Sequence, residues 1–112
     1  MKTLPRDGRT LDRIRKIFAL SENDLAVVLG VQRQSVTGWR EGGIPSSRRA
    51  SVERLNDLAG VLHEELIPSR IPEVVRTPDE WLEGRTILET IRIDGPEAVY
   101  GYLTRLFGYG GT

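Results

Sequence analysis

The chain has 112 residues, of which 38% are hydrophobic, and it contains no cysteine. A chain of this length makes one domain, or two very small ones that share a core, and the lack of cysteine excludes disulfide bonds, thiolate metal sites and a cysteine nucleophile. No apolar run approaches the ~20 residues that span a bilayer, and the N-terminus lacks a signal-peptide core, so we expect a cytoplasmic protein.

The formal net charge is zero, but the charges are unevenly distributed along the chain. Residues 1–56 hold 11 Lys and Arg against 6 Asp and Glu, a net charge of +5, whereas residues 57–112 hold 5 against 10, a net charge of −5. A basic half suits phosphate groups and an acidic half suits a basic protein partner, with chance clustering as the alternative.

The first predicted helix covers about residues 10–20, after a polar and frayed start. Two shorter helices follow over residues 21–42, separated by a forced turn. Ser21 lies three residues before Asp24, which predicts a capped helix start. Gly30 suits the left-handed conformation that ends a helix. In the second short helix, Val36 and Trp39 are spaced to face inward.

The outer face of this second short helix carries long or hydroxylated side chains near its start. Such donors can reach base edges when a helix enters the major groove, although an ordinary solvated face is the alternative. Arginines at the start of the next helix, which follows Ile44-Pro45, are candidates to contact the DNA backbone. The predicted DNA-binding residues are Gln32, Arg33, Gln34, Ser35, Thr37, Arg40, Arg48 and Arg49.

The order Leu-Ala-x-x-Leu-Gly-Val, then Gln-Ser-Val, then Trp and Gly, then Ile-Pro resembles the helix-turn-helix of the Xre/Cro/phage-repressor family. The resemblance implies an all-α N-terminal bundle that binds operator DNA. Two residues depart from the strongest DNA binders of the family. Glu22 would repel a phosphate, and Gly38 stands where a base-reading side chain is common.

Beyond this motif we expect a helix over about residues 46–66, capped by Ser46 or Ser47, with an apolar stripe and a surface His63. Residues 67–78 hold three prolines and predict an extended connector. Thr77 then predicts the cap of a short helix that Trp81 anchors. A helix over residues 86–93 and a last helix over residues 96–107 follow. The last helix is expected to bury Val99, Leu103, Leu106 and Phe107.

The apolar spacing of the second half, with Trp81-Leu82 and Asp94-Gly95, resembles antitoxins that carry the MbcA/ParS toxin-binding domain. The resemblance implies a DNA-binding domain over residues 1–66, a connector over 67–78 and a toxin-binding domain over 79–112. It implies an antitoxin that represses its own operon, as a homodimer or a larger complex with the toxin. The toxin would be of the NAD-consuming RES type or a related ADP-ribosyltransferase. The implied toxin contacts are Trp81, Tyr100, Arg105, Phe107, Tyr109 and Gly110.

No catalytic constellation is visible in the sequence, and we expect neither an enzyme nor a metal or cofactor site. Gly42-Gly43 lacks the lysine of a phosphate-binding loop, and the chain has one histidine and no strand-borne serine. Two alternatives remain open. The chain could be a stand-alone repressor whose C-terminal half serves dimerisation, or an interaction module that has lost DNA binding.

Overall fold

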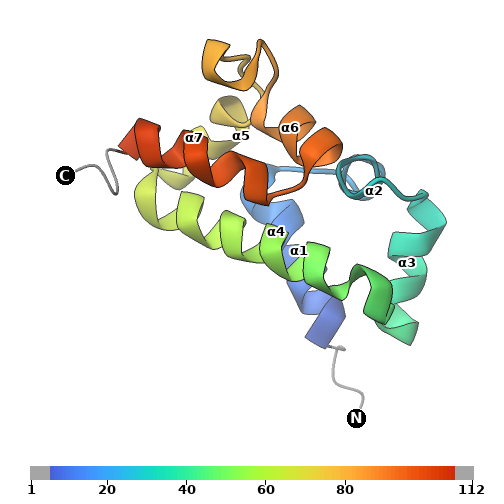
Figure 1. The fold of residues 1–112 in the computed structure, drawn as a ribbon. Helices are drawn as coiled ribbons and strands as arrows, with labels where there is room; N and C mark the ends of the chain where they lie inside the picture. Colours follow the sequence, from blue (N-terminus) through green and yellow to red (C-terminus); the bar gives the residue numbers. More distant parts are fainter. Residues whose placement is uncertain (1–5, 108–112) are drawn as a thin grey trace.

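A computed structural model describes residues 6–107, which form seven α-helices and two short 3-10 helices (Figure 1). The only backbone bridge within this range joins Asp79 to Arg85, so the predicted all-α class is confirmed. In chain order the elements are α1 (Arg6–Phe18), α2 (Glu22–Leu29), α3 (Arg33–Gly42), α4 (Ser46–Glu65), η1 (Pro68–Arg70), α5 (Ile71–Val74), η2 (Glu80–Leu82), α6 (Ile87–Asp94) and α7 (Glu97–Phe107).

The turn between α2 and α3 follows the predicted chemistry. The Ser21 hydroxyl accepts from the Asp24 amide, and the Asp24 carboxylate accepts from the Ser21 amide, which completes a capping box. Gly30 ends α2 at φ 71°, in the left-handed region that a residue without Cβ adopts without strain. These two local features fix where α2 begins and ends, and therefore where α3 starts.

One continuous hydrophobic core joins the two halves of the chain. α1 packs on α4, α6 packs on α2, and α7 lies along α4 (Figure 1). Each helix turns its apolar stripe toward the others. The fully buried residues of this core include Phe18 of α1, Leu58 of α4, Ile71 of α5, Ile87 of α6 and Val99 of α7.

The segment predicted as an extended connector is helical for most of its length. Ile71 and Val75 are completely buried in the shared core. The guanidinium of Arg76 donates to the backbone carbonyls of Phe18 and Ala19, both at 2.8 Å, and so caps the end of α1. Pro68 and Pro72 lie at helix starts, where the missing N–H costs nothing, and tertiary packing sets the conformation.

Four further expectations are corrected. α1 begins at Arg6, four residues before the predicted start. Pro45, not Ser46 or Ser47, is the N-cap of α4. Asp79 caps η2, while the Thr77 hydroxyl donates instead to the Glu73 carbonyl. Leu82 is the buried anchor of η2, and Trp81 and Leu106 are largely exposed.

None of the helices within residues 6–107 combines the length and apolar character needed to cross a membrane.

Candidate DNA-binding and protein-binding surfaces

The outward face of α3 borders a wide hollow of about 820 Å³. Five of its lining residues come from the turn and the start of α3, together with Asn23 of α2 and Gly38. Nothing lies within 4 Å of the position that a Cβ at Gly38 would take, so the glycine leaves this face open. The predicted DNA-binding residues that line the hollow are Gln32, Arg33, Gln34 and Thr37.

Arg33 and Arg48 project into solvent. Within residues 6–107 neither side chain takes part in a hydrogen bond or an ion pair. Gln32 caps α3 without a side-chain hydrogen bond, so the first amides of that helix are also unoccupied by side chains. Ser35 is half-buried at the base of the helix.

Arg40 does not project freely into solvent as predicted but binds two carboxylates of the protein, the mostly buried Glu22 and the exposed Asp12. Its Nε and Nη2 donate to Glu22 at 3.0 and 2.7 Å, and its Nη1 donates to Asp12 at 2.6 Å. The Thr37 hydroxyl also donates to Glu22, at 3.2 Å, and Arg15 lies 3.4 Å from the same carboxylate. Glu22 therefore ties α3 to α1 and α2.

This arrangement changes the expected effect of Glu22 on DNA. The Glu22 side chain is 14% exposed, and the arginines beside it offset its charge. The hydrogen bond from Arg40 lowers the pKa of Glu22 below its ordinary value of 4.5, against the opposing effect of burial. Glu22 thus holds the outer face of α3 in place through Thr37 and Arg40.

We expect Glu22→Gln to destabilise the protein by about 1–2 kcal/mol at pH 7, because a charge-assisted hydrogen-bonded pair is lost. A lowered carboxylate pKa contributes stability that is complete above the unfolded pKa of about 4.5 and is lost as the pH falls through the folded value. Chemical denaturation of wild type and variant at pH 7, 5 and 3 tests this.

Glu41→Gln, which changes an exposed carboxylate of α3, is the matched control and should shift stability by less than about 0.5 kcal/mol. A Glu22→Gln penalty that is equal at pH 7 and pH 3 would contradict the role assigned to the charge.

Arg49 is likewise engaged within the protein. It donates to the Asp7 carboxylate at 2.9 Å and to the Ile44 carbonyl at 3.2 Å, and Asp7 also accepts from the Ile44 amide. The Arg49 hydrogen bond is the main reason that the pKa of Asp7 is lowered. These bonds join the loop before α4 to α1, so Arg49 has fewer donors left for a phosphate than Arg48.

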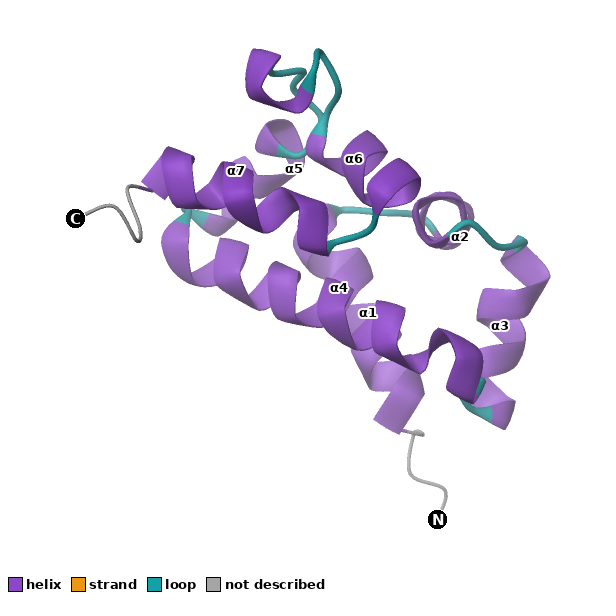
Figure 2. Ribbon diagram, in the orientation of Figure 1, coloured by secondary structure: helices purple, strands orange, loops and turns teal. Residues whose placement is uncertain are grey.

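The segment between α5 and α6 forms a finger, residues 76–86, that projects from the helical body (Figure 2). Trp81, in η2 of the finger, is 64% exposed, and the guanidinium carbon of Arg105 lies 3.9 Å from its ring centroid. The Tyr102 hydroxyl donates to Asp79 at 3.1 Å, and burial and this carboxylate raise the pKa of Tyr102. Two contacts from α7 therefore hold the finger.

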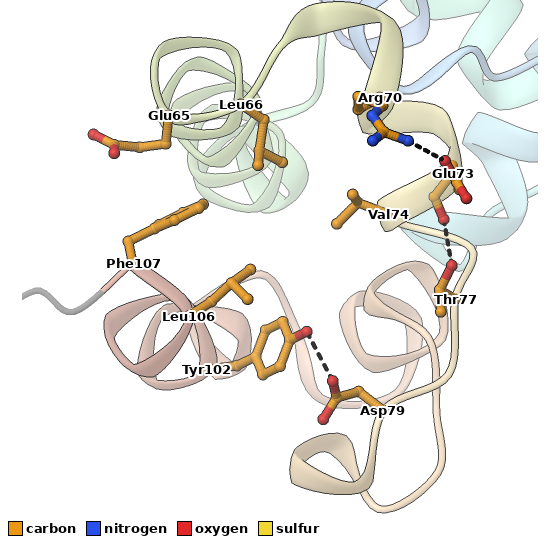
Figure 3. Close-up of a pocket in the computed structure, with 10 residues that line it drawn as sticks. All are labelled: Glu65, Leu66, Arg70, Glu73, Val74, Thr77, Asp79, Tyr102, Leu106 and Phe107. Atoms are coloured by element: carbon orange, nitrogen blue, oxygen red, sulfur yellow. Dashed lines mark hydrogen bonds and ion pairs between the residues drawn. The ribbon is translucent and has the colours of Figure 1, made fainter.

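A groove of about 560 Å³ opens beside the finger, between the end of α4, α5 and the end of α7 (Figure 3). Apolar side chains from three helices reach toward its centre, and carboxylates stand around its edge. The lining residues are Glu65, Leu66, Arg70, Glu73, Val74, Thr77, Asp79, Tyr102, Leu106 and Phe107.

Three of the predicted toxin-binding residues thus lie at this end of the molecule. Trp81 and Arg105 are in contact, and Phe107 lines the groove. Tyr100 is part-exposed on α7, and burial together with Asp57 and Glu97 raises its pKa. Tyr109 and Gly110 lie outside the described residues.

Comparisons with known proteins point to one kind of relative. No protein-family model matches the chain. The chain is 29% identical over 84 residues to a probable mycobacterial cidal antitoxin of Mycobacterium tuberculosis strain H37Rv, covering 75% of this chain and 73% of the relative. Its fold matches a chain of the M. tuberculosis MbcT-MbcA toxin-antitoxin complex with a TM-score of 0.74 and 15% identity, covering 97% of this chain and all of the other. The chain is therefore similar in sequence to an antitoxin and shares an all-α fold with a toxin-antitoxin component.

Sequence reasoning missed the groove and the Glu22 cluster. The sequence does contain a signal for the groove in the spacing of Tyr102 and Leu106. These two residues share a helix face displaced from the buried Val99 and Leu103. The carboxylates around the groove come from three separate segments, and only the folded chain brings them together. No group of three or more His, Asp or Glu residues within residues 6–107 could hold a metal ion.

Proposed function

We propose that the chain is an antitoxin that binds a toxin through the finger and the end of α7 and blocks the toxin's activity. The main observation in support of this proposal is that Trp81 is an exposed aromatic side chain, which Arg105 holds beside an apolar groove. Trp and Arg are the residues that most often dominate protein interfaces, and a rigid pair loses little entropy on binding. The similarity to a probable antitoxin supports this assignment.

We further propose that the toxin is of the NAD-consuming RES type or a related ADP-ribosyltransferase. The support is the resemblance of the second half of the sequence to MbcA/ParS-type antitoxins. The test is to measure NAD consumption by the product of the neighbouring gene, with and without one equivalent of this chain. Loss of NAD that the chain suppresses is the expected result, and a partner that leaves NAD intact would remove this part of the proposal.

Autorepression is the second activity we propose. The support is the α3 face, where Arg33 and Gln34 are exposed and the helix start has no side-chain cap. Residues 1–66 would serve DNA and residues 79–112 the toxin, with residues 67–78 between them, although all three segments share one core. The alternative of a stand-alone repressor predicts full operator affinity without the toxin and no rescue of cells from it.

Replacing Arg33 with alanine should weaken operator binding by about 1–3 kcal/mol and relax base preference, if Arg33 reads a guanine through two hydrogen bonds. Electrophoretic mobility shifts with the promoter DNA of its own operon, at several salt concentrations, measure this effect. Arg9→Ala, on the exposed face of α1, is the control and should leave base preference unchanged. Wild-type binding by Arg33→Ala at every salt concentration would exclude Arg33 from the DNA site.

A further inference from the structure

The floor of the groove is apolar and partly uncovered. Leu66, Val74 and Phe107 line it, and Leu106 at its edge is 46% exposed. Ile67, the residue after Leu66, is 68% exposed. A volume of about 560 Å³ lies within the range of pockets that bind compact ligands and has room for more than one large side chain. Apolar surface gathered in a concave site favours a partner that covers it.

The edge of the groove is acidic. Glu65, Glu73 and Asp79 stand on three sides. Among the lining residues within 6–107, Arg70 is the only cation, at 3.4 Å from Glu73 in an exposed ion pair. The half of the chain that contains the groove carries a net charge of −5. An acidic edge around an apolar floor is complementary to an apolar side chain with cations on either side.

The walls of the groove are fixed before any partner binds. The Tyr102 hydroxyl donates to Asp79, and the Thr77 hydroxyl donates to the Glu73 carbonyl at 2.7 Å (Figure 3). These bonds connect α7 to the finger, and the finger to α5, along two sides of the groove. A site whose walls are already held together pays little ordering cost on binding.

We infer that this groove receives a segment of the toxin in which large apolar side chains are flanked by lysine or arginine. The inference rests on the proposed antitoxin function, and it adds the chemistry of the partner's segment. The groove and Trp81 then form two adjacent parts of one interface. The groove selects the segment by its charge, and Trp81 contributes an aromatic ring to the contact.

The first test uses peptides and the full chain without the toxin. Three capped hexapeptides are titrated while amide NMR signals are followed: Arg-Lys-Leu-Phe-Lys-Arg, Glu-Asp-Leu-Phe-Asp-Glu and Arg-Lys-Ser-Ser-Lys-Arg. Only the first should shift the amides of Leu66, Val74 and Leu106, with smaller shifts at high salt. Equal shifts from the first two peptides would overturn the charge preference.

The second test uses the product of the neighbouring gene and groove variants. Leu106→Lys should weaken its binding at least about tenfold. The substitution removes an apolar contact and places a positive charge next to the lysine or arginine side chains of the partner. Val27→Lys changes an equally exposed apolar residue of α2 and should leave the affinity unchanged. Glu65→Lys combined with Glu73→Lys should reduce the association rate about tenfold at low salt, whereas Glu64→Lys, outside the groove, should reduce it much less.

The outcomes separate the two proposals. If the neighbouring product binds wild type and Leu106→Lys equally well, the groove inference is wrong and the antitoxin function stands. If it does not bind wild type but the basic apolar peptide still occupies the groove, the proposed function is wrong and the chemical preference of the groove stands. If neither binds, both are wrong.

Two other occupants would overturn the inference. Deleting residues 108–112 should leave the groove amides of the free protein unchanged, and a shift would make the chain's own end the occupant. Dilution should also leave them unchanged, and a concentration-dependent shift that Leu106→Lys removes would make a second copy of the chain the occupant.

Discussion

Replacing Trp81 with alanine should weaken toxin binding about 30-fold or more without lowering the unfolding temperature. The ring is 64% exposed in the free protein, so its removal takes little from the core. In the complex it would be covered, and truncating a covered Trp at the centre of an interface typically costs 2 kcal/mol or more. The measurements are the dissociation constant by calorimetry with the neighbouring gene's product, and thermal unfolding of the free chain.

Ile93→Ala is the matched control, because Ile93 is a large apolar side chain of α6 with 46% of its surface exposed. It should change neither the affinity nor the unfolding temperature. Arg105→Ala should reproduce part of the Trp81→Ala effect, since it removes the cation that holds the ring. Wild-type affinity in Trp81→Ala would exclude the finger from the interface.

Replacing Ile71 with alanine should destabilise the protein by about 2–4 kcal/mol, through lost burial and the cavity that remains. Ile71 is fully buried although it lies among the prolines between the two halves. An extended connector would predict almost no effect, because its side chains would contact only water. Urea denaturation, with the fitted free energy of unfolding for both proteins, decides between them.

Ile67→Ala provides the internal comparison, since the same substitution four residues earlier removes a side chain that is 68% exposed. It should change the free energy of unfolding by less than about 0.5 kcal/mol. Similar small values at both positions would mean that the segment is not part of the core.

Features set by neighbouring residues could be predicted from the sequence. The capping box at Ser21 and the left-handed Gly30 depend on contacts within three or four positions. The inward faces of α3 and α4 follow from helical spacing, and Val36 and Leu58 are fully buried as expected. The all-α class followed from the same periodicity.

Features set by contacts between residues far apart in the chain could not be predicted from the sequence. Spacing alone places Arg40 on the outer face, but Glu22 and Asp12, 18 and 28 positions away, bind its guanidinium. The three prolines indicated an extended segment, yet burial of Ile71 and the cap by Arg76 on α1 outweigh that local preference. Leu106 has the spacing of a core residue, yet 46% of its surface is exposed at the edge of the groove.

The DNA-binding and toxin-binding roles differ in what supports them. For DNA, the exposed Arg33 of α3 and Arg48 of α4 are the predicted arginines that remain after Arg40 and Arg49 bind carboxylates within the protein. Two free arginines give a weaker salt dependence than the four predicted arginines would. The face proposed to bind the toxin carries more organised features, because two contacts hold the finger beside an acidic groove.

Growth of cells that express the neighbouring gene's product, with and without this chain, tests the central claim most directly. We predict that the product alone arrests growth, that the chain restores growth and co-purifies with the product, and that Trp81→Ala restores it only when strongly overexpressed. Continued arrest in cells that contain an excess of the folded wild-type chain would contradict the assignment as an antitoxin.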